Sequence, residues 1–391
     1  MHVALIIERI EAWRGGAETS TMQSAGYLAR GGCQVSVLTT SHAPSTPEIN
    51  MIPIKASGAF RAAKTFLFAR RAAEYVRTHD FDIVHSITPC PVADVYQPRG
   101  GTVPETLARN VALRKTGVQR GFKRLGQRLS LKYQVVAGLE RRLLVRDPPP
   151  WVIAISQYVS DQLQHHYGFD SSRIRSVFNG VDPDRTSDQE RRIDRTQVRR
   201  QFELADDDLV MLCIAHNFKL KGVGSLIQAL ARCPEERIHA LIVGRDNPTP
   251  FVTQAKQLGI ADRVIFTGPT RRIPAFFHAA DLLVHPTFYD PCSRVVLEAL
   301  AAGLPVVTTR FNGAAERITD GQQGYVIETP TDIDALADRI DRLCDDDHRR
   351  ACAAQAVQAV VGISMQEHAN KIRTLYEDIL RNGCTERRMY R

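Results

Sequence analysis

The sequence predicts an α/β protein made of two doubly wound parallel-sheet domains with a cleft between them. Two series of short apolar runs, each alternating with helical patterns, are separated by a polar, charge-dense stretch that ends near residue 206. Short apolar runs of this kind are typical of strands buried on both faces of a parallel sheet. The chain has 391 residues, 43% of them hydrophobic, which is enough for two cores.

The first series of apolar runs predicts an N-terminal domain that spans residues 1–200. A glycine pair and a helical pattern follow the first run and lead to the second, which is the order of a βα unit in a parallel sheet. The runs predicted as strands are VALII (3–7), CQVSVLTT (33–40), FDIVHSIT (81–88) and WVIAIS (151–156).

The second series predicts a C-terminal domain that spans residues 205–365, followed by one last helical pattern within residues 366–391. Doubly wound sheets bind ligands beyond the carboxyl ends of their strands, so we expect the functional site at those ends. The runs predicted as strands are LVMLCIAH (209–216), IHALIVG (238–244), RVIFTG (263–268), DLLVHPT (281–287) and LPVVTT (304–309).

The positive charge of the chain is concentrated in one segment. The formal net charge is +8, and residues 109–146 alone contain eleven Lys or Arg against one acid, Glu140. Apolar residues such as Phe122 and Leu129 are interleaved with the basic ones, which favours an amphipathic surface that docks on an anionic membrane. An ordinary solvated helical face is the alternative.

Composition and motifs argue against several classes of protein. The eight cysteines occur singly, without a C-x-x-C pair, so neither a zinc site nor a disulfide framework is indicated. No apolar run approaches the roughly 18 residues of a membrane span, and Glu8 and Arg9 end the apolar start too early for a signal peptide. A nucleic-acid-binding protein would show aromatic and basic residues interleaved in a known module, and an NAD-dependent oxidoreductase would carry G-x-G-x-x-G. We therefore expect a soluble, cytoplasmic protein without a nucleic-acid partner.

Two turns are candidate phosphate sites. Gly15 and Gly16 lie between a strand and a helix, where the backbone can approach a ligand and the helix N-terminus offers N–H groups to an anion. Lys219 and Lys221 precede an apolar helix at the end of the first strand of the second domain, where a lysine supplies charge to a leaving pyrophosphate. The alternatives are a glycine turn required only for packing and two solvated loop lysines.

The stretch FYDPCSRVVLEALAAGLPVV, residues 288–307, predicts a helix with Ser293 as its N-cap and Gly303 beyond its end. We expect the first N–H groups of this helix to hold phosphate oxygens. Glu298 in the helix and Asp290 before it are expected to bind ribose and sugar hydroxyls, because ionised carboxylates offer only acceptors. A capped surface helix with an incidental glutamate is the alternative.

Taken in order, the motifs "GGAE", "FNGVD", "IVG", "FTGP", "AADLLVHPT", "D-x7-E" and "EALAAGLPVV" resemble those of the retaining family 4 (group 1) glycosyltransferases of the GT-B fold. The resemblance spans nearly the whole chain. It implies an acceptor-binding Rossmann-like domain, a second domain that binds most of a nucleotide-sugar, and a final helix that crosses back to the first domain. Within the family, the sequence is most similar to the lipopolysaccharide core glucosyltransferases that act on heptose, with which it shares "DVY" and a basic stretch.

Carried over position by position, the resemblance assigns roles to particular residues. Glu298 would bind the ribose, Asp290 the donor sugar and Lys221 the pyrophosphate, and these three are the catalytic candidates. The residues assigned to donor binding are Gly15, Gly16, Asn217, Lys219, Lys221, Asp290, Pro291, Cys292, Ser293 and Glu298.

The sequence departs from the family pattern at three points. Asp290 stands where the family usually has Glu, so the carboxylate reaches one methylene less. Either Asn217 or Lys219 is the first member of the usual basic pair. The family often has a histidine in a first-domain loop, whereas DVYQPRGGT (94–102) has none. Arg99 is the candidate replacement for this histidine, and Arg99 and Gly16 are assigned to acceptor binding. His85 lies on the preceding strand, where its surroundings in the sequence are typical of a histidine in the core.

The resemblance implies a retaining, metal-independent hexosyltransferase without a resident cofactor. The leaving pyrophosphate would take the acceptor proton on the same face of the sugar. The acid triplets at 206–208 and 345–347 favour solvated acids over a metal site. A UDP-sugar, with UDP-glucose favoured, would donate to a glycan or glycolipid acceptor in lipopolysaccharide core or related cell-envelope synthesis, in the cytoplasm or at the inner face of its membrane. The alternative is an exopolysaccharide or glycolipid glycosyltransferase that uses a GDP- or ADP-sugar.

Overall fold

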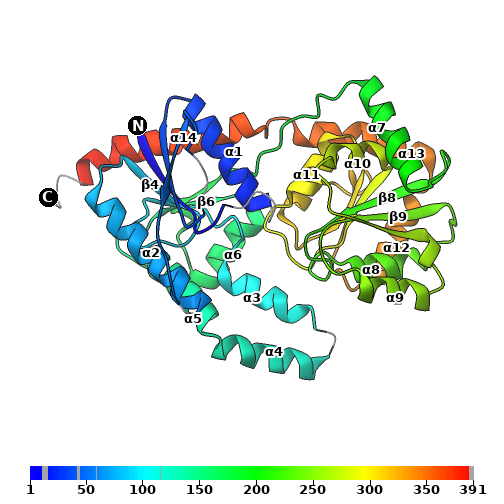
Figure 1. Cartoon of the computed structure of the whole chain (residues 1–391), viewed down its shortest axis with the longest axis horizontal. Helices are drawn as coiled ribbons and strands as arrows, with labels where there is room; N and C mark the ends of the chain where they lie inside the picture. Colours follow the sequence, from blue (N-terminus) through cyan, green and yellow to red (C-terminus); the bar gives the residue numbers. More distant parts are fainter. Residues whose placement is uncertain (11–15, 42–44, 59, 115, 387–391) are drawn as a thin grey trace. The chain divides into compact units, whose positions relative to one another are not determined.

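The computed structural model describes residues 1–10, 16–41, 45–58, 60–114 and 116–386 (Figure 1). The chain divides into two compact units. The first comprises Met1–Gly180 together with Met365–Arg391, and the second comprises Val181–Ser364. Each unit is built on one parallel sheet.

The sheet of the first unit has, within the described residues, seven parallel strands in the order β3-β2-β1-β4-β5-β6-β7. The strands are β1 (His2–Ile6), β2 (Gln34–Thr39), β3 (Ile49–Pro53), β4 (Ile83–Ser86), β5 (Val95–Tyr96), β6 (Trp151–Ala154) and β7 (Ile174–Ser176). The helices are α1 (Gly16–Arg30), α2 (Arg61–Thr78), α3 (Val103–Ala112), α4 (Gly117–Leu129), α5 (Leu131–Leu144), α6 (Gln157–Tyr167), η1 (Ser171–Arg173) and α14 (Met365–Glu386). The chain runs outward from β1 to β3 and returns at β4, which is a doubly wound arrangement.

Helices α1 and α14 pack together on one face of this sheet (Figure 1). Ile83 and Val95 of the sheet share a buried cluster with Ile372 and Tyr376 of α14. The final helix therefore completes the core of the first unit, although about 180 residues of chain separate it from the rest of that unit.

A buried carboxylate, Glu140 of α5, joins the elements on the other face. Its Oε1 accepts a hydrogen bond from the Tyr96 hydroxyl at 2.7 Å, and its Oε2 accepts from the Val103 backbone N–H at 2.8 Å and from the Tyr167 hydroxyl. Burial raises the pKa of Glu140, although these hydrogen bonds act to lower it. One side chain thus connects β5, α3, α5 and α6.

The sheet of the second unit has six parallel strands in the order β10-β9-β8-β11-β12-β13. The strands are β8 (Leu209–Ile214), β9 (Ile238–Val243), β10 (Val264–Gly268), β11 (Leu282–His285), β12 (Val306–Thr309) and β13 (Gly324–Ile327). The helices are α7 (Asp188–Gln201), α8 (Val223–Leu230), α9 (Thr249–Gln257), η2 (Ala261–Arg263), α10 (Ile273–Ala279), α11 (Arg294–Ala301), η3 (Gly313–Arg317), α12 (Ile333–Arg342), α13 (Asp346–Ala356) and η4 (Val357–Val360). The two sheets confirm the prediction of two doubly wound parallel domains.

The boundary between the units lies at Gly180 and not between residues 200 and 205. The polar stretch that suggested a linker forms α7, which packs on α10 in the second unit (Figure 1). Arg199 of α7 is buried and donates to Asp281 at 2.7 Å. His278 of α10 lies between Asp184 and Asp194, with 2.9 Å from each ring nitrogen to a carboxylate oxygen. These charged contacts hold residues 181–201 against the rest of the second unit.

Both acid triplets contain a carboxylate with a local structural role. Asp345 accepts a hydrogen bond from the His348 backbone N–H at 2.7 Å and so caps α13. Asp208 accepts from the Ala205 backbone N–H at 2.7 Å in the turn before β8. Within the described ranges, no group of three or more His, Cys, Asp or Glu side chains is arranged to hold a metal ion. No helix in the same ranges is long and apolar enough to cross a bilayer.

Candidate functional site

The two central strands of the second unit, β8 and β11, lie side by side where the winding of the sheet reverses. Ligands of doubly wound sheets bind at the carboxyl ends of such strands. The loops after these two strands are joined there, because the Leu220 carbonyl accepts hydrogen bonds from the Phe288 backbone N–H at 2.9 Å and from the Thr287 hydroxyl at 3.2 Å. These loops carry most of the donor-binding residues predicted from the sequence.

Gly222, at the start of α8, allows the two loops to meet. Its φ of 73° lies in the left-handed region, and a Cβ at this position would lie 2.0 Å from the Pro286 carbonyl oxygen. A side chain here would force the loops apart. The glycine therefore fixes the place of the neighbouring Lys221.

Lys221 and Asp290 form a largely buried ion pair, with 2.5 Å between Nζ and Oδ2. The exposed fractions of the two side chains are 9% and 16%. Burial by itself would raise the pKa of Asp290, but the Lys221 ammonium and the nearby ring of His285 hold this pKa well below its usual range. The structure thus brings together two of the three catalytic candidates and keeps the carboxylate ionised.

The backbone around Asp290 is held by the loop after β12. The Asp290 N–H donates to the Phe311 carbonyl at 2.8 Å, and the Gly313 N–H donates to the Asp290 carbonyl at 2.9 Å. Asn312, which is 1% exposed, accepts from the Ser293 backbone N–H at 3.0 Å. Sequence reasoning missed Asn312 because nothing in the pattern of a β-strand loop marks a buried amide.

Helix α11 begins at Arg294 with Ser293 at the N-cap position, as predicted. The Ser293 hydroxyl makes no capping hydrogen bond, and its own N–H is taken by Asn312. An α-helix leaves its first backbone N–H groups without intrahelical acceptors, and the positive end of its dipole favours an anion. Pro291 is half-buried and Cys292 is buried in the turn that leads to this helix end.

Glu298 lies one turn into α11 and pairs with Arg294, with 3.0 Å between Oε1 and the guanidinium nitrogen. Burial raises the pKa of Glu298 in spite of this arginine. The side chain is 29% exposed. The predicted ribose contact of Glu298 stays a prediction.

Asn217 and Lys219, the two candidates for the first member of the basic pair, differ in the structure. The Asn217 side chain accepts from the Leu220 backbone N–H at 2.9 Å and so shapes the loop. Lys219 is exposed. Of the two, Lys219 is therefore the one with a cationic side chain that reaches solvent.

Gly15, Gly16 and Arg99 are the site candidates of the first unit. Gly15 lies outside the described residues, and Gly16 is exposed at the first position of α1. Arg99 is buried, and its three guanidinium nitrogens bind Gln97, Ser20 and His368 at 3.0, 2.6 and 3.1 Å.

His85 is a buried histidine, as its pattern indicated. Its Nδ1 lies 2.5 Å from the Tyr376 hydroxyl, and burial together with Arg99 lowers its pKa to about 3. This neutral ring supports the packing of α14. The acceptor assignment of Arg99 and Gly16 stays a prediction.

Family comparisons agree with this division of the chain. Residues 14–185 match the family model described as Glycosyltransferase Family 4, and residues 194–359 match the model described as Glycosyl transferases group 1. The chain carries a glycosyltransferase family 4 domain and a glycosyltransferase group 1 domain. The sequence prediction of the family is confirmed.

Individual relatives of this glycosyltransferase support the same conclusion. The lipopolysaccharide glucosyltransferase WaaG of Escherichia coli (strain K12) is 28% identical over 323 residues, which are 81% of this chain and 82% of the relative. A crystal structure of WaaG matches with a TM-score of 0.81 and 25% identity over 96% of this chain and 99% of that one. The N-acetyl-alpha-D-glucosaminyl L-malate synthase of Bacillus anthracis is 26% identical over 321 residues, 80% of this chain and 79% of the relative.

Proposed function

We propose that this glycosyltransferase moves a hexose, glucose in the first instance, from a UDP-sugar to a saccharide acceptor of lipopolysaccharide core synthesis. One observation carries the donor part of the proposal. The start of α11, Lys221 and Asp290 meet at the carboxyl ends of β8 and β11, so an anion site and a hydroxyl acceptor lie next to each other. The likeness to WaaG over four fifths of the chain supports the choice of sugar and pathway.

The proposed chemistry assigns a separate task to each group. The first N–H groups of α11 and the Lys221 ammonium bind the diphosphate and stabilise the negative charge that grows as it leaves. Asp290 accepts hydrogen bonds from sugar hydroxyls and Glu298 from the ribose. The bond from the anomeric carbon to the diphosphate breaks, the acceptor oxygen bonds on the same face, and its proton passes to the leaving phosphate oxygen. The configuration of the sugar is retained.

Isothermal titration calorimetry with UDP-glucose, GDP-glucose and ADP-glucose tests the donor assignment. We expect binding of UDP-glucose, and incubation with a heptose-containing core acceptor should yield glucosylated product. Binding of GDP- or ADP-glucose in its place would favour the alternative exopolysaccharide or glycolipid enzyme. Binding of none of the three would overturn the proposal. L-malate is assayed as a second acceptor, because the malate synthase of Bacillus anthracis belongs to the same set of relatives.

The reaction is expected to proceed without a divalent cation, because the positive charge that the leaving diphosphate requires comes from Lys221 and the α11 amide groups. Activity in excess EDTA should match activity in buffer with Mg²⁺. Loss of transfer in EDTA that added Mg²⁺ restores would contradict this expectation.

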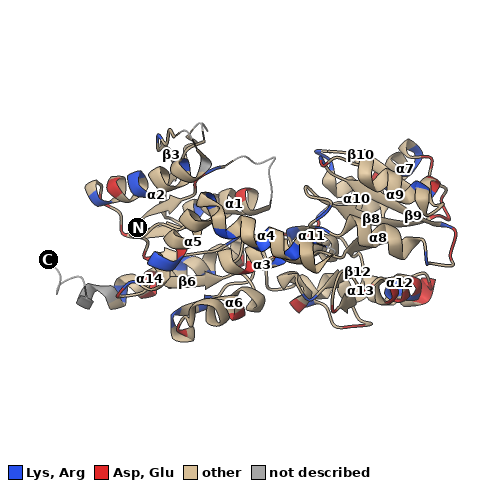
Figure 2. Cartoon of the chain, turned by 90° about the horizontal axis from the view of Figure 1, so that it is seen from below, with Lys and Arg blue, Asp and Glu red and all other residues tan. Residues whose placement is uncertain are grey.

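We also propose that α4 binds the anionic membrane that carries a lipid-linked acceptor. Val118, Phe122, Leu125 and Leu129 recur at intervals of three or four residues, so they share one face of α4, and each is more than half exposed. Four of the other positions along the helix are basic (Figure 2), and the rest are glycine or glutamine. Apolar residues on one face and basic residues around it are the pattern of helices that lie in a membrane interface.

Liposome co-sedimentation tests the role of α4. Replacing Phe122 and Leu129 by serine should reduce binding to vesicles that contain anionic lipid by about tenfold or more, because each large apolar side chain contributes about 1.5–3 kcal/mol when buried. Val361→Ser is the matched control, since Val361 is similarly exposed in the second unit. Equal binding to purely zwitterionic vesicles, or equal loss in the control, would count against the proposal.

A further inference from the structure

His285, the last residue of β11, is a buried histidine whose ring makes no hydrogen bond to the described residues. Its side chain is 1% exposed, and neither ring nitrogen has a hydrogen-bond partner in this part of the chain. Buried polar groups are nearly always paired, and an unpaired one costs free energy. An unpaired ring of this kind in the interior of the second unit indicates a function.

The ring of His285 faces the Lys221–Asp290 ion pair. Its Nε2 lies 3.8 Å from Asp290 Oδ2, the same oxygen that the Lys221 Nζ contacts at 2.5 Å. The backbone of His285 is fixed by pairing with β12 and by the Thr308 hydroxyl, which donates to its carbonyl at 2.8 Å. One carboxylate oxygen therefore has two nitrogen neighbours, one in contact and the other just beyond hydrogen-bond distance.

The proposed function gives Lys221 and Asp290 different targets. Lys221 is needed by the diphosphate and Asp290 by the sugar, yet in the structure the two bind each other. When the diphosphate draws the ammonium away, a largely buried carboxylate loses its partner, and an unpaired buried charge is strongly destabilising. The carboxylate then requires another donor if it is to stay ionised and accept from the sugar hydroxyls.

His285 is suited to supply that donor. Burial, together with the Lys221 ammonium, lowers the pKa of His285 against the opposing effect of Asp290, so the ring is neutral. A neutral imidazole has one N–H to donate. The distance of 3.8 Å between Nε2 and Oδ2 has to shorten by about 0.6 Å to reach the upper end of the usual range for a hydrogen bond.

We propose that His285 is a positioning residue of the glycosyltransferase. Its Nε2–H donates to Asp290 when Lys221 binds the diphosphate of the donor, so that Asp290 stays ionised and oriented towards the sugar hydroxyls. The pair Lys221–Asp290 and the pair His285–Asp290 are two alternating contacts of one carboxylate. This inference rests on the proposed function, because it requires a diphosphate that takes Lys221.

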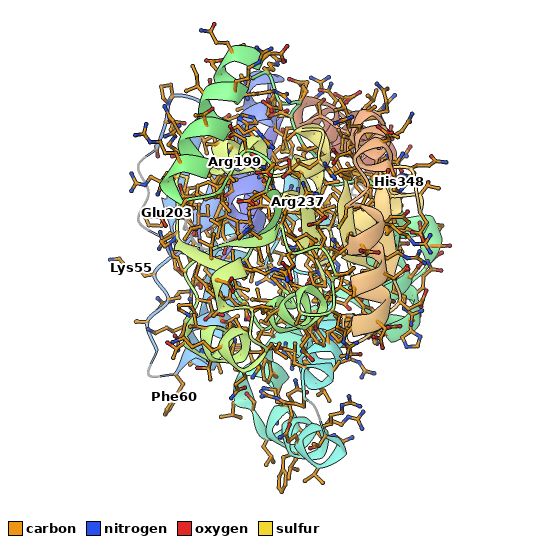
Figure 3. All side chains as sticks on the ribbon, turned by 90° about the vertical axis from the view of Figure 1, so that its right-hand side faces the viewer. Lys55, Phe60, Arg199, Glu203, Arg237 and His348 are labelled. Atoms are coloured by element: carbon orange, nitrogen blue, oxygen red, sulfur yellow. The ribbon has the colours of Figure 1, made fainter. Side chains whose placement is uncertain are left out.

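The test compares His285→Leu with His285→Gln, whose side-chain nitrogen can replace Nε2. Calorimetry measures the affinity for UDP, and steady-state kinetics measure transfer from UDP-glucose. We expect His285→Leu to weaken UDP binding about ten- to hundredfold, the range for a hydrogen bond to a charged group. His285→Gln should stay within about threefold of the wild type on the same scale. His348→Leu, a change at α13 (Figure 3), should leave both measurements unchanged.

A double-mutant cycle with Asp290→Asn separates this role from packing. In that background there is no carboxylate charge to support, so His285→Leu should change UDP affinity by less than about twofold. Equal losses in both backgrounds, a Gln variant as weak as Leu, or a Leu variant equal to wild type would each overturn the inference. A wild-type enzyme that binds none of the three nucleotide sugars would overturn the proposed function itself, and this outcome is separate because it needs no variant.

Discussion

Replacing Asp290 by asparagine should lower kcat/KM for sugar transfer at least about a hundredfold, equivalent to about 3 kcal/mol for a hydrogen bond to a charged group. The amide keeps the volume of the side chain but removes the charge that accepts from the sugar. UDP binding should be unchanged or tighter, because the variant releases Lys221 from its 2.5 Å ion pair. Calorimetry with UDP and initial rates with UDP-glucose measure the two effects separately.

The pH dependence of the wild type adds a second check on Asp290. Its pKa is depressed in the fold, so the charge of the pair is present above the ordinary aspartate pKa and is lost only as the pH falls through the lower folded value. The fall of kcat/KM at low pH should therefore not be centred on the pKa of an ordinary aspartate. Equal losses of UDP binding and transfer in Asp290→Asn would instead mean that the variant is damaged as a whole. Asp338→Asn, on the exposed side of α12, is the matched control and should leave both measurements unchanged.

Replacing Glu140 by alanine should destabilise the first unit by about 3 kcal/mol or more, because three donors lose one common acceptor and each unpaired buried group costs about 1–3 kcal/mol. The affected donors are the Tyr96 and Tyr167 hydroxyls and the Val103 N–H. Hydrogen exchange should show loss of protection in α3, α5 and α6, with the second unit unaffected. Glu74→Ala, an exposed change on α2, is the matched control and should change little.

The sign of the pH dependence distinguishes Glu140 from an ordinary surface acid. Because its pKa is raised in the fold, its contribution to stability is fully present below the unfolded pKa and is lost as the pH rises through the folded value. As the pH rises from the unfolded to the folded pKa of Glu140, the unfolding free energy of the wild type should therefore fall relative to that of Glu140→Gln. A difference that does not change with pH would contradict the assignment of the shift to Glu140.

Five of the six strands of the second unit were predictable because their apolar runs are continuous. The run at 209–216 contains β8, and the run at 281–287 contains β11. Strand β13 was missed because it begins at a glycine and its apolar run extends only from Tyr325 to Ile327, and β5 because it has only two residues. Strand β3 was missed because Asn50 interrupts its apolar run and Pro53 ends it.

The predicted position of the domain boundary was wrong for a different physical reason. The segment that forms α7 is rich in Arg and Asp, a composition shared with linkers, and its packing depends on buried charged contacts such as Arg199 with Asp281. A capping box of Ser187 and Glu190 and the acidic first turn were local signals of a helix start there. Burial of an arginine is decided by its partner, which lies 82 residues away in the chain and is invisible to a local pattern.

The candidate functional site shows the same limit of local sequence patterns. Ser293 at the start of α11 and Lys221 after β8 follow from local turn and helix patterns. That Lys221 and Asp290 contact each other depends on the Gly222–Pro286 approach, and the roles of Asn312 and His285 depend on contacts between three separate loops. Motifs therefore select the candidate residues of the site, whereas the contacts of those residues come from the fold.

The return of α14 to the first unit makes residues 181–364 a cassette within that unit. The ends of the cassette are adjacent, since the Val181 N–H donates to the Ile363 carbonyl at 2.9 Å. Recombination between related enzymes that exchanges this cassette at both joints keeps α1 and α14 from one parent. A single crossover would instead pack the α14 of one parent on the α1 of another. A paired exchange thus replaces residues 181–364 and leaves the packing of α1 against α14 unchanged.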